Sequence, residues 1–97
     1  MLNFEWDNDK NKSNQAKHKI SFEDATDVFN DEDRLQFELE KNGEWRNLTI
    51  GKAFHAITTV VYTMRNLIVR VISARRASQD ERRAYLTNKF NKNGDNE

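Results

Sequence analysis

The chain contains no cysteine and no proline, and it has only three glycines and two histidines among its 97 residues. Without cysteine, disulfide bonds, thiolate metal sites and cysteine nucleophiles are excluded, so packing and hydrogen bonds alone must hold the fold. Two histidines are too few for a histidine-rich metal site. The glycines are isolated from one another, which excludes a glycine-rich phosphate loop. We therefore expect neither a metal nor a cofactor.

Long apolar runs are also absent. No run approaches the roughly 18 residues of a membrane span, and the first residues lack a basic region followed by an apolar segment. We therefore expect no membrane association and a cytoplasmic location. Since 36% of the residues are apolar and 33% are charged, residues 1–97 have room for one small domain with a modest core. We interpret residues 91–97 as a frayed polar tail.

Charge is balanced over the whole chain but divided along it. The formal net charge of zero argues at first against a nucleic-acid partner. Residues 1–44, however, carry six basic and twelve acidic side chains, whereas residues 45–97 carry ten basic and four acidic ones. Residues 45–79 contain no acid, and their basic side chains are Arg46, Lys52, Arg65, Arg70, Arg75 and Arg76. Arginine suits phosphate oxygens and stacking on bases, although pairing with the acidic first half is the alternative.

Helical spacing predominates in the first third of the chain. Residues 4–6 alternate as a short strand does, and residues 7–9 offer helix-capping side chains. Residues 10–20 are typical of a solvent-facing helix. Ser21 is a good N-cap for a second helix over about residues 22–30, which ends in an acidic turn.

From residue 35 onward the spacing of apolar residues changes from helical to a period of two, which is typical of strands. We expect strands over residues 35–40, 44–54, 56–63 and 67–74, with turns at Asn42-Gly43 and Met64-Arg65-Asn66, followed by a helix over about residues 79–90. Short links favour neighbouring strands, so the economical assembly is a four-stranded antiparallel meander. The sequence therefore predicts an α+β domain with two N-terminal helices and one C-terminal helix.

Strand alternation predicts where the arginines of the last strand point. One face would hold Ile68, Arg70, Ile72, Ala74 and Arg76, and the other Leu67, Val69, Val71, Ser73 and Arg75. Arg75 and Arg76 then face opposite sides of the sheet. Arg65 lies at the other end of the hairpin, so these arginines do not form one compact cluster.

RNA cleavage without a metal is the chemistry that these residues allow, because RNA carries its own nucleophile, the 2′-hydroxyl. A protein need only orient that group, move protons and stabilise the charge on the phosphorane-like transition state. Arginines supply the charge. Candidates for proton transfer are Lys17, His18, Glu44 and Tyr62, and candidate stacking surfaces are Trp45, Phe54 and Tyr62.

An ordered series of short segments then narrows the interpretation. They are Phe4-Glu5-Trp6-Asp7, Lys10-Asn11 with Asn14, Lys17-His18 before Ser21-Phe22-Glu23-Asp24-Ala25, Val28-Phe29-Asn30-Asp31, Glu44 with Arg46, Ile50-Gly51, Val60-Val61-Tyr62-Thr63 with Arg65, Ile72-Ser73-Ala74-Arg75-Arg76-Ala77, and Glu81-Arg82 with Tyr85. Over about residues 4–85 the series resembles the BrnT toxin family. The resemblance implies a RelE-like ribonuclease fold and bacterial toxin activity against RNA. It also implies neutralisation by a BrnA-type antitoxin, which carries the contact to operator DNA, and we expect the complex to be a heterotetramer.

The resemblance and the chemistry together assign candidate roles. We expect Arg65, Arg75 and Arg76 to contact phosphate and transition-state charge, and Lys17, His18 and Tyr62 to transfer protons or contact RNA. Two alternatives stay open for single arginines: Arg75 would pair with Glu81 or Asp80, and Arg70 with an acid of the first two helices. Glu44 and Arg46 would form an internal pair. Lys19 stands where the family usually has glycine, at a position suited to a left-handed helix end.

Three functional hypotheses follow. The leading one is the toxin of a type II toxin–antitoxin system, a metal-independent endoribonuclease that inhibits translation and growth. The alternative is a non-enzymatic module that binds an antitoxin or nucleic acid. The third is a structural partner whose exposed strand and terminal helix dock another chain.

Overall fold

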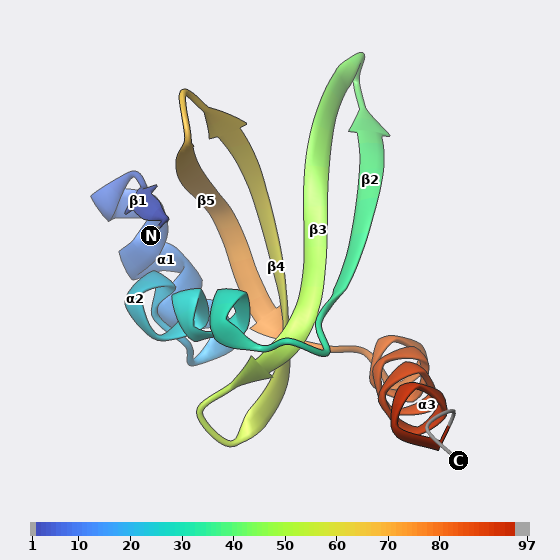
Figure 1. Cartoon of the computed structure of the whole chain (residues 1–97). Coiled ribbons are helices and arrows are strands. Elements are labelled where there is room, and N and C mark those ends of the chain that lie inside the picture. The colour runs from blue at the N-terminus through green and yellow to red at the C-terminus, as the bar shows by residue number, and fades with distance from the viewer. Residues whose placement is uncertain (1, 95–97) are drawn as a thin grey trace.

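A five-stranded mixed β-sheet forms the centre of the structure, a computed structural model that describes residues 2–94 (Figure 1). The elements are β1 (Asn3–Glu5), α1 (Asn8–His18), α2 (Phe22–Ala25) continued by the 3₁₀ helix η1 (Thr26–Asn30), β2 (Leu35–Lys41), β3 (Glu44–Ala53), β4 (Ala56–Arg65), β5 (Ile68–Arg76) and α3 (Gln79–Gly94). The strand order is β1-β5-β4-β3-β2. The predicted α+β class and the four strands of the meander are confirmed.

The predicted sheet was wrong in one respect, because the observed sheet has a fifth strand. β1 pairs with β5 in parallel, with Phe4 opposite Val69, so the sheet is mixed rather than antiparallel. The turn between β4 and β5 lies at Asn66 and Leu67, later than predicted, so Arg65 is the last residue of β4. The terminal helix continues to Gly94 instead of ending near residue 90, and the rest of the predicted tail lies outside the described residues.

A bulge in β5 changes which of its residues share a face. Tyr62 pairs with Val71 and Val61 with Ser73, so Ile72 has no partner in β4. The extra residue reverses the alternation, and Val71 therefore shares the helix-covered face with Ala74. The strict alternation predicted from the sequence was wrong at this point. Beyond the bulge Arg75 lies opposite Thr59 and Arg76 opposite Thr58, so these two arginines do lie on opposite faces of the sheet.

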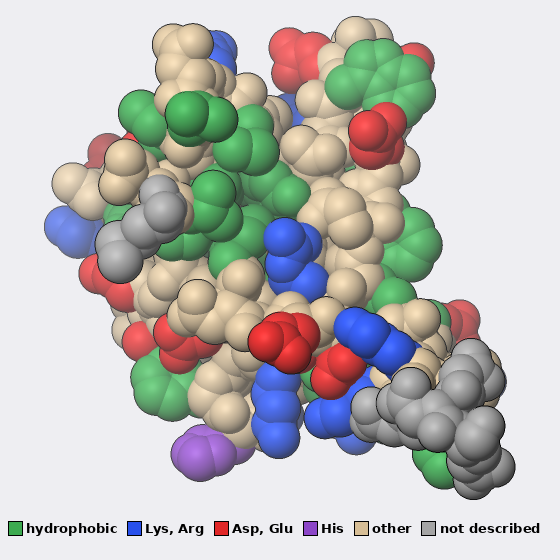
Figure 2. Space-filling model, viewed as in Figure 1, with side chains coloured by type: hydrophobic (Ala, Val, Ile, Leu, Met, Phe, Trp, Pro, Cys, Tyr) green, Lys and Arg blue, Asp and Glu red, His purple; other side chains and the backbone are tan. Residues whose placement is uncertain are grey.

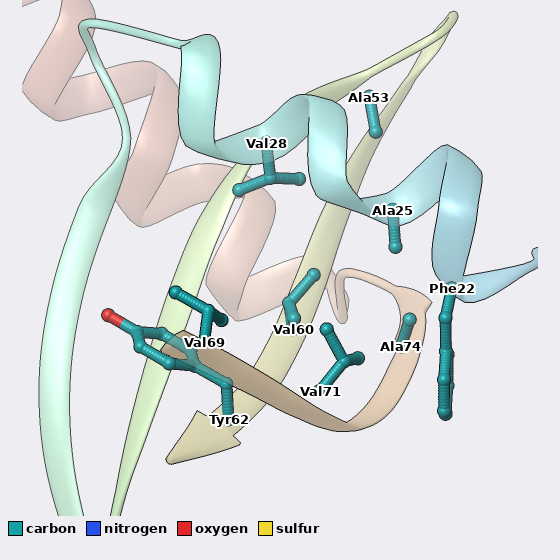
Figure 3. Packing of buried hydrophobic residues seen from close by; sticks show 9 residues of the cluster. All are labelled: Phe22, Ala25, Val28, Ala53, Val60, Tyr62, Val69, Val71 and Ala74. Carbon is teal, nitrogen blue, oxygen red and sulfur yellow. The ribbon is translucent and has the colours of Figure 1, made fainter. Parts of the chain in front are cut away.

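The main core lies between this face of the sheet and the segment formed by α2 and η1. Figure 3 shows its buried residues, which are Phe22, Ala25, Val28, Ala53, Val60, Tyr62, Val69, Val71 and Ala74. Phe29 packs at the edge of this cluster, with its ring centroid 5.3 Å from that of Phe4 and 5.0 Å from that of Tyr62. Tyr62 is therefore a core residue, and its hydroxyl donates to Oε1 of Gln36 at 2.9 Å.

Polar contacts, rather than burial, hold α1 in place, since none of its residues is buried. The amide of Asn14 donates to the carbonyl of Ala74 at 2.8 Å and to that of Ile20 at 3.2 Å, and accepts from the Ala74 N–H at 3.2 Å. Oδ1 of Asn11 accepts from the N–H of Phe22 at 2.8 Å. The Asn14 amide thus ties α1 to the C-terminal part of β5, and the Asn11 amide ties α1 to the start of α2.

Gly51 lies where β3 passes beneath η1, and the two backbones approach closely. A Cβ atom at this position would lie 2.8 Å from Cγ1 of Val28 and 3.0 Å from Cβ of Arg34. These atoms belong to packed parts of the chain, so they have little freedom to move away. Glycine is therefore needed here for space.

We expect Gly51→Ala to lower the free energy of unfolding by about 1–3 kcal/mol, because the added methyl group overpacks the contact with Val28. Urea denaturation monitored by circular dichroism measures the change. Gly43→Ala is the comparison for backbone strain without overpacking. An added Cβ there meets no atom within 4 Å, whereas the φ of 81° at Gly43 is strained for alanine. A Gly51→Ala variant as stable as the natural protein would contradict the steric account.

The helix α3 lies beside the other face of the sheet (Figure 1). Ile50 and Tyr85 are both 2% exposed, outside the main core cluster. The hydroxyl of Tyr85 donates to Oδ2 of Asp31 at 2.5 Å, and burial together with this bond raises the pKa of Tyr85. Within residues 2–94 no helix is long and apolar enough to cross a membrane.

Candidate functional site

A cleft of about 200 Å³ opens at the end of the sheet where the β3–β4 turn, the end of α1 and the end of β5 meet. Its lining includes two of the predicted site residues, His18 and Arg76, and a histidine that was not among those predicted, His55. The other lining residues are Lys19, Ile20, Asp24, Ala53, Phe54, Ala56 and Thr58. Figure 2 shows basic side chains gathered beside a histidine at the lower edge of the molecule, where Figure 1 has the β3–β4 turn. The cleft therefore joins segments that are far apart in the sequence.

Arg76 is the last residue of β5, and its side chain is exposed. The register of the sheet sets it opposite Thr58, on the face that carries Ala74. In the part of the chain that the structure describes, its guanidinium has no ion pair within 4.0 Å. The N–H donors of an arginine without an ion pair are available to bind a phosphate group.

His18 is the last residue of α1 and is half-buried. Lys19 is the C-cap of α1 and has a left-handed φ of 62°, and its N–H donates to the Gln15 carbonyl at 2.9 Å. His18 also borders a second hollow of about 250 Å³, lined by Lys10, Ser13, Asn14, Lys17, Ile72 and Ser73. Because both hollows share His18, a continuous surface leads from the cleft past the predicted residue Lys17.

Arg75 does not take part in this cleft, because it lies on the opposite face of the sheet. Its guanidinium donates to both carboxylate oxygens of Glu81, at 2.7 and 3.1 Å. Thr59 and the N–H of Ser78 also donate to this carboxylate. The hydrogen bond from Arg75, followed by those from Ser78 and Thr59, lowers the pKa of Glu81 to about 2 against the cost of burial. The predicted alternative of a link to Glu81 is confirmed, and the pair ties α3 to the sheet.

The lowered pKa of Glu81 predicts that the stability of the protein falls in acid. Folding favours the ionised form of Glu81, so its contribution is complete above about pH 4.5 and is lost as the pH falls toward 2. Between about pH 4.5 and pH 2 we expect the natural protein to lose about 1–2 kcal/mol more stability than Glu81→Gln loses. The value is modest because solvent screens the partly exposed pair. Urea denaturation at a series of pH values measures it, with Asp80→Asn as the control on the same helical turn. Equal pH profiles for the natural protein and Glu81→Gln would contradict the assignment.

Two other predicted residues lie away from the cleft. Arg65 ends β4 at the far end of the sheet, seven residues along the strand from Thr58, or about 23 Å at roughly 3.3 Å per residue. Tyr62 lies between these positions and is 5% exposed within the core. The structure therefore brings His18 and Arg76 together, with Lys17 adjacent, and leaves Arg65, Arg75 and Tyr62 elsewhere.

The remaining arginines of the acid-free segment have local partners. Arg70 pairs with Glu5 of β1 at 2.6 Å, so the predicted alternative of an acid from the first two helices was wrong. The expected pair of Arg46 with Glu44 is present at 3.6 Å. The division of charge along the chain thus reflects pairing for Arg46, Arg70 and Arg75, whereas Arg65 and Arg76 have no ion pair among the described residues.

His55 was missed because only tertiary structure brings it to His18. In the sequence it stands between two β-rich runs, next to Phe54, and the expected strand ended at this phenylalanine. A histidine in a hairpin turn does not by itself indicate a functional site. The structure shows that this turn faces the end of α1 across the cleft.

The chemistry available in the cleft is proton transfer and anion binding. An imidazole can accept or donate a proton, and a guanidinium stabilises negative charge on phosphate. The carboxylate of Asp24 also lines the cleft and accepts hydrogen bonds from N–H or O–H groups. Within the described residues, no group of three or more His, Cys, Asp or Glu side chains has an arrangement that could hold a metal ion.

The fold and the cleft define a small α+β protein with basic and imidazole side chains at one end of its sheet. Residues 6–81 match the family model described as the ribonuclease toxin, BrnT, of type II toxin–antitoxin systems. Because the match covers most of the chain, the chain belongs to the BrnT family. Membership implies an antitoxin partner and, at the level of the family, ribonuclease activity. No curated protein matches the chain.

Proposed function

We propose that this protein is a metal-independent endoribonuclease toxin that cleaves RNA at the cleft lined by His18, His55 and Arg76. The observation that carries the proposal is the convergence of two imidazoles and an arginine free of ion pairs within the described residues, in a member of a ribonuclease toxin family. Its site of action is the bacterial cytoplasm, where a BrnA-type antitoxin neutralises it in a heterotetramer and carries the contact to operator DNA. The fold is RelE-like.

In this mechanism the substrate supplies the nucleophile. One imidazole takes the proton of the 2′-hydroxyl, whose oxygen forms a bond to phosphorus while the bond to the 5′-oxygen breaks. The other imidazole gives a proton to the leaving 5′-oxygen. Arg76 stabilises the negative charge on the phosphorane-like transition state, and the products are a 2′,3′-cyclic phosphate and a 5′-hydroxyl.

The residues around the cleft have supporting roles. Lys17 lies along the adjoining hollow, where it contacts the phosphate next to the one that is cleaved. Asn14 is a positioning residue, since its bonds to Ala74 hold the end of α1, and therefore His18, beside the end of β5.

Incubation of the purified protein with single-stranded RNA tests the proposal. We expect cleavage that persists in EDTA, yields 2′,3′-cyclic phosphate ends and stops when the nucleotide at the cleavage site carries 2′-deoxyribose. Expression in a bacterial host without an antitoxin gene should arrest growth. Loss of cleavage in EDTA would overturn the metal-independent mechanism. Tight RNA binding without cleavage would instead support the alternative of a non-enzymatic module.

A further inference from the structure

The β3–β4 turn has a residue that its backbone geometry does not favour. Ala53 pairs with Ala56, so Phe54 and His55 are the two central residues of the hairpin turn. Phe54 has a φ of 55°, a conformation that favours glycine or asparagine at such positions. The β2–β3 turn, by contrast, uses Asn42 and Gly43 for its positive φ values.

Burial of the phenyl ring does not offset this strain. The side chain of Phe54 is 59% exposed, although the same residue lines the cleft that contains His18 and Arg76. A strained and exposed aromatic residue reduces stability without adding to the core. Strain of this kind concentrates at functional sites, where the side chain rather than the backbone is required.

We propose that the β3–β4 turn is a nucleobase subsite, in which the ring of Phe54 stacks on the base of a nucleotide whose phosphate contacts Arg76. The inference rests on the proposed function for its ligand, single-stranded RNA. Aromatic rings at the mouth of a basic cleft bind bases of single-stranded nucleic acids by stacking, because every base has a π-face. The subsite therefore sets which part of the RNA strand lies next to the imidazoles.

The size and charge of the cleft favour a nucleotide over a simple anion. Its volume of about 200 Å³ is below the roughly 300–1,000 Å³ of pockets that enclose a whole drug-sized ligand, so it accommodates part of one nucleotide. Asp24 also lines the cleft, and inorganic phosphate offers its carboxylate neither a ribose hydroxyl nor a base amino group. The same carboxylate accepts a hydrogen bond from a ribose hydroxyl or a base amino group.

Binding of a non-cleavable RNA analogue separates this inference from catalysis. A fluorescein-labelled oligonucleotide with 2′-O-methyl ribose at every position serves as the probe, with affinity read by fluorescence anisotropy. We expect Phe54→Ala to weaken binding about tenfold, and Phe54→Trp to retain it, because stacking requires an aromatic ring. Leu67→Ala is the matched control, since Leu67 is also an exposed apolar residue of a hairpin turn with positive φ, at the other end of the sheet.

A second measurement excludes misfolding as the cause. Thermal unfolding should show that Phe54→Ala and Phe54→Gly fold as the natural protein does, and that Phe54→Gly is at least as stable because glycine relieves the strain. In competition, adenosine and guanosine monophosphates should displace the probe at lower concentrations than inorganic phosphate does. Unchanged affinity in well-folded Phe54→Ala, or equal competition by inorganic phosphate, would overturn the subsite. If the natural protein binds the probe but does not cleave RNA, the subsite stands and the proposed ribonuclease function fails.

Discussion

Replacement of Arg76 by alanine is expected to lower the rate of RNA cleavage by about 10²–10³-fold, the loss typical when one preorganised group that stabilises transition-state charge is removed. Arg76 is exposed at the end of β5 and has no ion pair within the described residues, so the substitution leaves no buried acid without a partner. The fold should therefore be unaffected. Arg76→Lys should recover part of the rate, because lysine keeps the charge but loses the planar fork of donors.

The controls for this prediction are other arginines of the chain. Arg83→Ala on α3 removes an exposed arginine outside the cleft and should leave the rate unchanged. Arg65→Ala tests whether cleavage takes place at the other end of the sheet, where Arg65 lies. If it costs as much as Arg76→Ala, or if Arg76→Ala cleaves normally, the cleft is not the catalytic site. Rates come from single-turnover cleavage of a labelled RNA, and growth arrest in a host without antitoxin provides an independent measurement.

Tyr85→Ala is expected to lower the free energy of unfolding by about 3–4 kcal/mol, in the range for loss of a large buried aromatic side chain. Tyr85 is 2% exposed and is the largest fully buried side chain of the described residues. Its removal leaves a cavity between α3 and the sheet. It also removes a hydrogen bond to Asp31, whose carboxylate still accepts from the N–H groups of Lys52 and Asp33.

Phe90→Ala on the same helix is the matched control, because its side chain is 77% exposed and its loss should change the stability little. Tyr85→Phe keeps the ring and should cost about 1 kcal/mol for the lost hydrogen bond. Urea denaturation gives all three values. A Tyr85→Ala variant about as stable as Phe90→Ala would mean that polar contacts, such as those of Glu81 with Arg75 and of Lys92 with Asp33, hold α3 rather than burial of Tyr85.

Local signals in the sequence predicted the elements that depend on local interactions. Ser21 and Ser78 accept hydrogen bonds from the N–H groups three residues later, as their capping patterns predict. Asn42-Gly43 forms the β2–β3 turn with positive φ at both residues. These features depend on residues close in sequence, so a single sequence contains the information that sets them.

Features that depend on distant segments were missed. The pairing of β1 with β5 joins residues more than sixty positions apart, and three residues carry too little pattern to predict it. The bulge at Ile72 has no glycine or proline to mark it. The candidate site was predicted in part, since His18 and Arg76 line one cleft, whereas His55 lines it only because the fold places the β3–β4 turn across the cleft from the end of α1.

The contact of Asn14 with β5 has a consequence for the edges of the sheet. β1 covers the outer edge of β5 only over residues 68–70, and beyond it the Asn14 amide bonds both backbone groups of Ala74. A side chain thus occupies the place that a further strand would take. β2, at the other end of the strand order, carries no such cover from another strand among the described residues. Within the described residues the open edge of the sheet is therefore that of β2, on the side of the sheet away from β5.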